Sequence, residues 1–228
     1  MTRASEVKRG AAVVPQARPT YHHGDLREAL LAAGDALIAE KGVSGFSLRE
    51  AARRVGVDPA ACYRHFRDKD AIFQELARRG FTRLAARMKA DLAAIARTSP
   101  ERSLVALGHA YVGFALEHPS SYRAMFGPTG VDARDDLLRG AYPEGEGPYD
   151  LLKETVRAWA ERIERDIDVD DASVALWASV HGIASLLIEG ALRPEDEKAQ
   201  RRILDTTLAA MLAGFEHGAR SRKSKRVR

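Results

Sequence analysis

The apolar residues of this chain recur at the spacing of an α-helix along almost its whole length. The first apolar stripe steps by three or four positions and consists of Leu26, Leu30, Ala33 and Leu37. Such a stripe is typical of a helix that buries one face. From Tyr21 onward no stretch alternates convincingly between apolar and polar residues, as a half-buried strand would. The pattern therefore predicts an all-α fold.

Helix start and stop signals divide the pattern near its beginning. Ser47, followed by Glu50 at the capping-box spacing, begins a short second helix that Gly56 ends. Asp58 then caps a third helix, with Pro59 at its first position, which we expect to reach about residue 65. Two short helices joined by a tight turn and braced by a longer one predict a helix-turn-helix unit.

The remainder of the chain continues the helical pattern. Further helices are predicted at about 69–97, 101–118, 119–126, 148–167, 170–190 and 194–220. The Gly- and Pro-rich stretch 127–148 is predicted to be a mobile loop, and residues 1–20, which lack an apolar period, a flexible arm.

The charge of the chain is unevenly distributed. Residues 1–80 hold 14 basic and 10 acidic side chains, and residues 81–219 hold 16 and 22. The last nine residues hold six basic groups and no acidic one. A basic N-terminal third followed by an acidic remainder indicates two functional regions, of which the first binds a polyanion. The basic tail either touches DNA non-specifically or only solubilises the last helix, and we favour the second interpretation.

Several classes of protein are excluded by composition and motifs. No apolar run approaches the roughly 18 residues of a membrane span, and a single cysteine, Cys62, fits a reducing cytoplasm. The histidines do not fall at a metal-ligand spacing, and no nucleophile elbow or phosphate-binding glycine loop is present. We therefore expect no catalytic residues, no metal and no cofactor. Cys62 is either a redox switch or a small buried hydrophobe, and we favour the latter.

Groups that can hold phosphates surround the predicted turn. They are Ser47, Arg49, Arg53, Arg54, Tyr63, Arg64, His65 and Lys69. A helical bundle with a solvated basic face remains the alternative.

The stretches 21–26, 46–52, 55–57 and 63–72 resemble the TetR family of bacterial transcriptional regulators. An aromatic-Arg-His-Phe-x-x-Lys signature lies at Tyr63 to Lys69. The resemblance implies an all-helical homodimer with a three-helix DNA-binding head and a larger body that senses a ligand and dimerises. It implies that Tyr63 and Lys69 hold phosphates, and that Ser47 and Arg49 anchor the second helix on the DNA backbone. The predicted DNA-binding residues are Ser47, Arg49, Asp58, Ala60, Ala61, Tyr63, Arg64, His65 and Lys69.

The third helix departs from the common pattern of that family. Asp58 and Ala61 stand where a Ser or Thr is frequent, and Ala60 and Ala61 occupy base-facing positions. Two alanines offer only apolar contact, for example to a thymine methyl group. We expect Arg49, the arm or the shape of the DNA to contribute more of the specificity.

Two segments of the body resemble a TetR-type C-terminal subfamily. They are 118–126 and the Trp-x-x-x-His-Gly element at Trp177, His181 and Gly182. The helix that carries this element has an apolar stripe of Trp177, Val180, Ala184 and positions 187–188. With the stripe Ile203, Thr207, Ala210 and Phe215 of the last helix, it predicts a dimer surface that makes a four-helix bundle. The predicted effector contacts, each of which is alternatively a core residue, are Phe114, Tyr122, Met125, Phe126, Trp159, Trp177 and His181. For His181 a hydrogen-bonded core position is the favoured alternative.

Together these features predict a ligand-responsive transcriptional regulator, a repressor that leaves its operator on binding a small molecule. The expected partners are a palindromic double-stranded operator, an apolar or amphipathic effector and a second copy of the chain, with no membrane. The expected domains are the arm 1–20, the DNA-binding domain 21–68, the effector-binding and dimerisation domain 69–219, and the tail 220–228. The alternative is a helical small-molecule-binding protein or enzyme whose head does not bind DNA.

Overall fold

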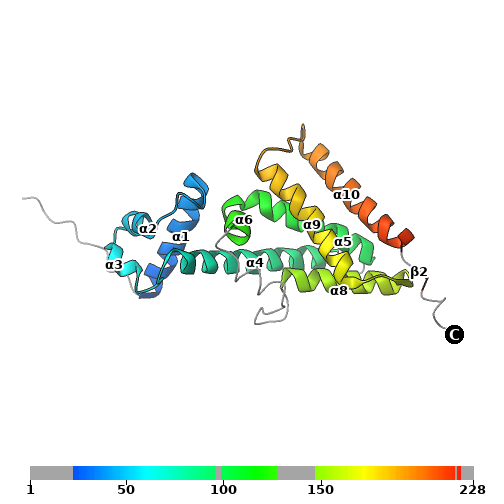
Figure 1. Ribbon diagram of the computed structural model, residues 1–228, viewed down its shortest axis with the longest axis horizontal. Helices are drawn as coiled ribbons and strands as arrows, with labels where there is room; N and C mark the ends of the chain where they lie inside the picture. Colours follow the sequence, from blue (N-terminus) through cyan, green and yellow to red (C-terminus); the bar gives the residue numbers. More distant parts are fainter. Residues whose placement is uncertain (1–22, 96–98, 128–146, 219, 222–228) are drawn as a thin grey trace, which may run out of the picture.

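The helices of the computed structural model begin and end close to the predicted capping residues. The structure describes residues 23–95, 99–127, 147–218 and 220–221, which are almost wholly helical (Figure 1). The elements are α1 His23–Lys41, α2 Leu48–Val55, α3 Pro59–Cys62, α4 Lys69–Ala94, α5 Pro100–Glu117, α6 Pro119–Phe126, α8 Pro148–Arg162, β1 Arg165–Asp166, α9 Val169–Ile188, α10 Glu197–Gly218 and β2 Arg220–Ser221. The all-α prediction is confirmed. The predicted arm, most of the 127–148 loop and most of the tail lie outside the described residues.

Local hydrogen bonds explain the shape of the α2–α3 unit. Ser47 Oγ accepts from the backbone N–H of Glu50 at 3.2 Å, so the predicted N-cap is present. Gly56 ends α2 with φ at 78°, a left-handed conformation that an L side chain rarely adopts. Asp58 accepts from the backbone N–H of Ala60 at 2.7 Å and so caps α3. Helix α3 is shorter than predicted, because residues 63–65 continue as turns.

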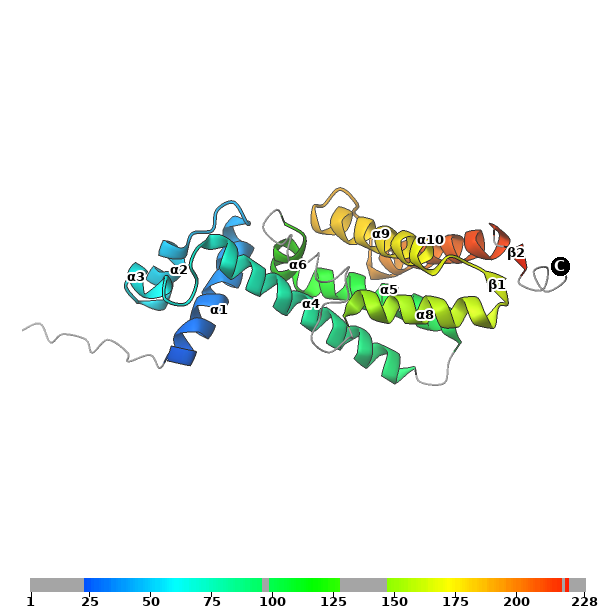
Figure 2. The same cartoon turned by 60° about the horizontal axis from the view of Figure 1, so that its bottom comes forward.

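Two hydrophobic cores lie along the molecule. The head core is built from α1, α2, α3 and the first turns of α4, with Leu30, Phe46 and Phe73 at its centre. The body core is built from the rest of α4 and from α5, α6, α8, α9 and α10, with Tyr111 and Trp159 almost wholly buried. Figure 2 shows α8, α9 and α10 gathered around α5 at the end away from the head.

Helices α4 and α6 connect the two cores. Helix α4 runs from the head into the body (Figure 1), with Phe73 in the head core and Phe81 in the body core. On α6, Ala124 packs in the head core and Met125 in the body core. The two helices approach closely at Gly80, where an added Cβ would lie 2.5 Å from Met125 Sδ. Helix α6 therefore packs directly on α4 at the point where the two cores meet.

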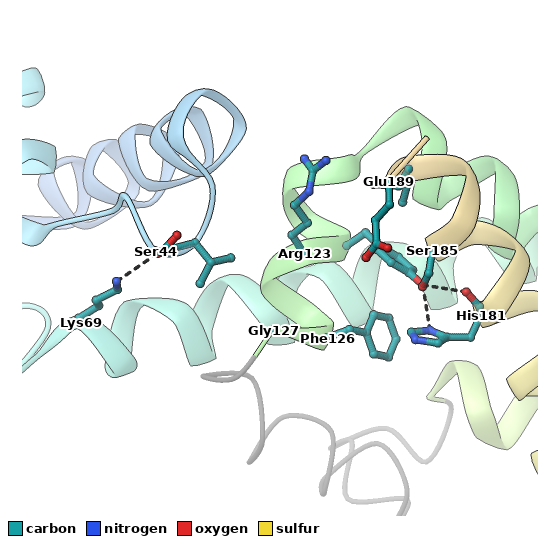
Figure 3. A pocket seen from close by; sticks show the side chains of 11 residues that line it. Ser44, Lys69, Arg123, Phe126, Gly127, His181, Ser185 and Glu189 are labelled. Carbon is teal, nitrogen blue, oxygen red and sulfur yellow. Dashed lines mark hydrogen bonds between the residues drawn. The ribbon is translucent and has the colours of Figure 1, made fainter. Parts of the chain in front are cut away.

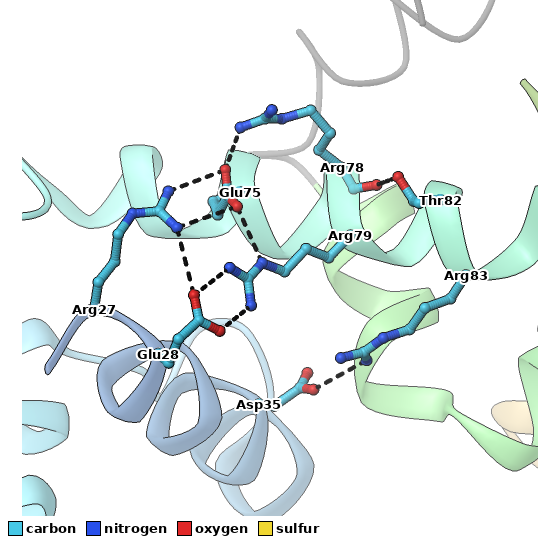
Figure 4. Close-up of polar contacts among 8 residues, drawn as sticks. All are labelled: Arg27, Glu28, Asp35, Glu75, Arg78, Arg79, Thr82 and Arg83. Atoms are coloured by element: carbon cyan, nitrogen blue, oxygen red, sulfur yellow. Dashed lines mark hydrogen bonds and ion pairs between the residues drawn. The ribbon is translucent and has the colours of Figure 1, made fainter. Parts of the chain in front are cut away.

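An ion-pair cluster clamps α1 onto α4 (Figure 4). Glu75 of α4 binds Arg27 of α1, with 3.2 Å between Oε2 and Nη2, and binds Arg79 at 3.0 Å. Arg79 in turn makes two hydrogen bonds of 2.6 Å to Glu28 of α1. Arg78 also pairs with Glu75. Charge thus reinforces the apolar contact between these two helices.

The predicted helix 148–167 is wrong at its C-terminal end. Helix α8 stops at Arg162, and Glu164 adopts a positive φ of 53°. The chain then forms the short strand β1, whose residues Arg165 and Asp166 pair antiparallel with Ser221 and Arg220 of β2. Backbone pairing between residues more than fifty positions apart leaves no helical or alternating period to detect. The start of the basic tail is thereby held at the end of the body opposite the head (Figure 1).

Candidate nucleic-acid interface and ligand cavity

The α2–α3 unit presents an exposed face made of short and basic side chains. Tyr63 is 51% exposed although it is a large aromatic residue, and Arg49 and Arg64 are exposed beside it. The Ser47 hydroxyl oxygen accepts the cap bond, which leaves its proton able to donate to a phosphate. Ala60 is exposed and Ala61 half-buried, so only small side chains stand at the start of α3.

Ion pairs distinguish the arginines of this face. Arg54 is bound through both guanidinium ends to Glu40, and Arg53 lies 3.4 Å from Glu50. Within the described segments, neither Arg49 nor Arg64 has a carboxylate at ion-pair distance. Because no carboxylate of the described segments has to be displaced, Arg49 and Arg64 are, of these four arginines, the ones most available to a polyanion.

The acid and the lysine of the predicted site, Asp58 and Lys69, already make intramolecular hydrogen bonds. One carboxylate oxygen of Asp58 is bound as the cap of α3. Lys69 Nζ donates to the carbonyl oxygen of Val43 at 3.0 Å and lies over the rings of Phe46 and Phe73, at 5.9 and 5.4 Å. The structure therefore places Lys69 at the junction of head and body, apart from the exposed Tyr63.

A cavity of about 670 Å³ lies at this junction between the head and the body (Figure 3). We call it the junction cavity. It is lined by Val43, Ser44 and Lys69 from the head, by Tyr122, Arg123, Phe126 and Gly127 from the end of α6, and by His181, Ser185, Ile188 and Glu189 from the end of α9. Its volume falls in the range of small-molecule sites.

A hydrogen-bond network forms the body side of the junction cavity. His181 Nδ1 lies 2.9 Å from the hydroxyls of both Tyr111 and Tyr122. The Tyr122 hydroxyl also lies 2.8 Å from Ser185 Oγ. The ring of His181 packs against that of Phe126, with centroids 4.5 Å apart. Burial raises the pKa values of Tyr111 and Tyr122, so both phenols remain protonated and able to donate.

The structure separates the residues predicted as effector contacts. Tyr122, Phe126 and His181 come together in the junction cavity. Trp177 packs edge-on to Tyr111, with centroids 5.0 Å apart, and borders a separate apolar void of about 20 Å³. The remaining three are core residues and line none of these spaces. They are Phe114, Met125 and Trp159.

Other lining residues were missed from the sequence. Ser185, Ile188 and Glu189 follow His181 by four, seven and eight positions, a helical spacing that places all four on one face of α9. This spacing was the available signal. Nothing in the sequence connected them to Ser44 of the head.

The predicted stripe of the dimer surface is partly wrong. Val180 and Ala184 are buried in the body core. The outward face of α9 instead carries Val174, which is 56% exposed, and Leu186, which is 46% exposed, with the exposed Ala178 between them. The helical period defines both faces of the helix but does not say which one meets the core.

Three other features were considered for function: the Cys62 thiol, possible metal-binding groups and the apolar helix α9. Burial chiefly, and the charge of Asp58 to a smaller degree, raise the pKa of the Cys62 thiol, which favours the inert interpretation. The described residues contain no group of three or more His, Cys, Asp or Glu that could hold a metal ion. The expectation that no apolar stretch approaches the length of a membrane span is wrong for α9, which among the described helices is long and apolar enough to cross a membrane. This helix packs against α5, α8 and α10 as a body helix does.

Comparison with protein-family models gives two matches. Residues 30–76 match the bacterial regulatory proteins of the tetR family, and residues 104–219 match the tetracyclin repressor-like C-terminal domain. YobS of Bacillus subtilis (strain 168), an uncharacterized HTH-type transcriptional regulator, is 38% identical over 85 residues. That alignment covers 37% of this chain and 43% of YobS.

Solved structures share the fold over most of the chain. A protein of unknown function from Rhodococcus sp. RHA1 is 30% identical, with a TM-score of 0.65 and coverage of 89% of this chain and 99% of that one. The regulator FadR of Bacillus subtilis, solved in complex with stearoyl-CoA, has a TM-score of 0.65 at 13% identity. The match covers 82% of this chain and 98% of FadR.

Proposed function

The chain belongs to the TetR family of transcriptional regulators, and from this premise we propose that it is a repressor whose operator binding is controlled by a small molecule in the junction cavity. Family membership makes it a DNA-binding regulator and not an enzyme. The observation that carries the ligand control is that the cavity is lined from both the head and the body. A ligand that touches both parts binds better to one head orientation than to another, and so shifts the population toward it.

Exposed groups around α2 and α3 support the proposed DNA contacts. Ser47, Arg49, Tyr63 and Arg64 are exposed donors on one unit, which suits phosphate binding. Of the other residues proposed for this interface, Ala60 and Ala61 would contact base edges, Asp58 would position α3, and His65 and Lys69 would flank the DNA backbone. Lys69 would first have to leave its contact with Val43.

A homodimer on a palindromic operator is the proposed assembly. The outward face of α9, with Val174, Ala178 and Leu186, leaves apolar surface in water, and the neighbouring α10 exposes the small residues Ala209 and Ala213. Helices α9 and α10 of two copies would cover these faces as a four-helix bundle. A two-fold axis would then present two heads to two half-sites about one helical turn apart.

Finer assignments follow the same reasoning. We assign the body to the Trp-x-x-x-His-Gly subfamily because of the element at Trp177 to Gly182. We propose that residues 21–68 form the DNA-binding domain and residues 69–219 the effector-binding and dimerisation domain. We also propose that the protein acts in the cytoplasm. The proposed effector is apolar or amphipathic and contacts Tyr122, Phe126 and His181. The shared fold with FadR, which was solved with stearoyl-CoA, adds general support for such a ligand.

Operator binding tests the proposal. Full-length protein is titrated against labelled DNA from upstream of its own gene at several salt concentrations, with a scrambled duplex as the control. We expect specific binding that falls steeply with salt, because phosphate contacts release counterions. The double variant Arg49→Ala/Arg64→Ala should lose this binding and keep its helical circular dichroism. Equal binding of both duplexes, or none, would support the non-DNA-binding alternative.

A further inference from the structure

The charges that line the junction cavity are unevenly placed. Lys69 of the head and Arg123 of α6 are its two cations, and Glu189 of α9 is its one carboxylate. Among the described residues, neither cation has a carboxylate within ion-pair distance. Glu189 lies beside Tyr122 and Ser185, at the body side of the cavity (Figure 3). Lys69 is therefore the cation that the head supplies to the cavity, whereas Arg123 and Glu189, one of each charge, come from α6 and the end of α9.

The ammonium group of Lys69 has unused donor capacity. It is partly buried, and within the described segments one backbone oxygen, that of Val43, accepts from it at 3.0 Å. The faces of Phe46 and Phe73 stabilise its charge but accept no conventional hydrogen bond. An ammonium group has three donors, so two have no acceptor among the described residues and can bind a ligand. A partly desolvated cation of this kind favours an anionic partner over a neutral one.

The rest of the wall suits the uncharged part of an amphipathic molecule. Phe126 and Ile188 supply apolar surface, while the mutually hydrogen-bonded hydroxyls of Ser185 and Tyr122 make the far end polar. An anion at that end would meet Glu189. Because Glu189 offsets the charge of Arg123 and no carboxylate lines the head side, Lys69 is the favoured position for an anionic group.

We propose that the junction cavity takes an amphipathic organic acid, with its carboxylate on Lys69 of the head and its apolar part along Phe126 and Ile188 of the body. This inference rests on the proposed function and adds the chemical class and orientation of the effector. The acid would bridge the head and the body, because its carboxylate would be bound by Lys69 at the start of α4 and its apolar part would contact α6 and α9. Its affinity then depends directly on the position of the head.

Matched probes test the charge preference. Decanoate and decan-1-ol share an alkyl chain and differ in the carboxylate, and 1-naphthoate and 1-naphthol make a second, aromatic pair. Binding to the DNA-free, full-length protein is measured by calorimetry. We expect at least one acid to bind about 10-fold or more tightly than its alcohol, the size of one charge-assisted hydrogen bond. If no acid binds more tightly than its alcohol, the inference is overturned.

Variants identify the group that recognises the acid. Lys69→Met should reduce the preference for the acid to within about threefold, and Lys69→Arg should retain it. The matched control is Lys198→Met on the exposed surface of α10, which should leave the preference unchanged. Arg123→Met, at an exposed position, should reduce it partially and decides the question if Lys69→Met does not fold. A Lys69→Met protein that keeps the full preference, or loses acid and alcohol equally, refutes the assignment.

Operator binding separates this inference from the function on which it rests. If the wild type binds its operator and is released by a neutral ligand while acids have no effect, the proposed function is supported and the proposed ligand class is refuted. If it binds the acid but not DNA, the proposed function is wrong and the site assignment stands. With both correct, the acid should weaken operator binding, and the operator should weaken acid binding by the same factor.

Discussion

The substitution Glu75→Gln tests whether the ion-pair cluster holds α1 on α4 (Figure 4). Glutamine keeps the size of the side chain and removes the charge that attracts Arg27, Arg78 and Arg79. The amide oxygen can still accept one of the lost hydrogen bonds, but its NH2 group faces donors. We expect a less stable head with an unchanged fold.

The exposure of the partners sets the size of this effect. Breaking a fully buried ion pair costs about 3–5 kcal/mol, whereas an exposed pair contributes about 0–1 kcal/mol. The Glu75 side chain is 12% exposed, and the side chains of Arg27 and Arg79 are 37% and 31% exposed. An intermediate loss of about 2 kcal/mol follows, close to one charge-assisted hydrogen bond. For a chain of this size that corresponds to a fall in Tm of roughly 4–8 °C.

The assay is thermal and urea unfolding of the full-length protein, followed by circular dichroism at 222 nm. The matched control is Glu154→Gln, an exposed carboxylate on α8 that has no ion pair within the described segments. Its Tm should stay within about 1 °C of wild type, as is usual for surface substitutions. If Glu75→Gln behaves like this control, the cluster does not stabilise the head and the reasoning is refuted.

The dependence on pH gives an independent check. Burial alone would raise the pKa of Glu75, but hydrogen bonds from Arg27 and Arg79 outweigh it, so the pKa of this carboxyl lies below its usual range. A carboxyl group with a lowered folded-state pKa contributes stability above its unfolded pKa and loses it as the pH falls through the folded value. Wild type should therefore lose more Tm than Glu75→Gln between about pH 5 and pH 3. Parallel curves for the two proteins would contradict this.

Three further substitutions and one labelling experiment test other features. Tyr63→Phe removes an exposed hydroxyl and should weaken operator binding about 10-fold with Tm unchanged, measured by fluorescence anisotropy; equal affinity would remove Tyr63 from the interface. Tyr122→Phe removes the hydrogen bonds to His181 and Ser185 of α9 and should lower the free energy of unfolding by about 1–2 kcal/mol. The control Tyr149→Phe removes the hydroxyl of another buried tyrosine and should lower it less. Gly56→Ala places an L side chain at a φ of 78° and should cost roughly 1–2 kcal/mol in urea unfolding; a neutral result would mean that the turn adapts. Cys62 should react with a thiol reagent only at the rate of unfolding, because burial raises its pKa and blocks access; rapid labelling of the native protein would show that the site opens.

Features that depend on neighbouring residues were predicted from the sequence. The caps at Ser47 and Asp58 and the left-handed Gly56 are formed as expected, since each depends on hydrogen bonds within a few positions. The all-α class follows from the same short-range periodicity. Local chemistry also located the exposed unit that carries Arg49 and Tyr63.

Features that depend on residues far apart in the chain were not predicted from the sequence. Periodicity could not tell which aromatics line a space, so Phe114, Met125 and Trp159 were grouped with Tyr122 and Phe126 although they fill the core. It also could not distinguish the buried from the outward face of α9, or detect the pairing of β1 with β2. Such decisions depend on which helix packs on which face.

The sequence by itself determined the helical class, the helix-turn-helix unit and the kind of protein, because capping, turn geometry and helical period are set by residues a few positions apart. Only the tertiary structure decided that Lys69 of the head, Phe126 of α6 and Ser185 of α9 share one cavity. They are far apart in the chain and meet because α4 continues from the head core into the body core, with α6 packed beside both. Packing of that range leaves no local pattern for a sequence to display.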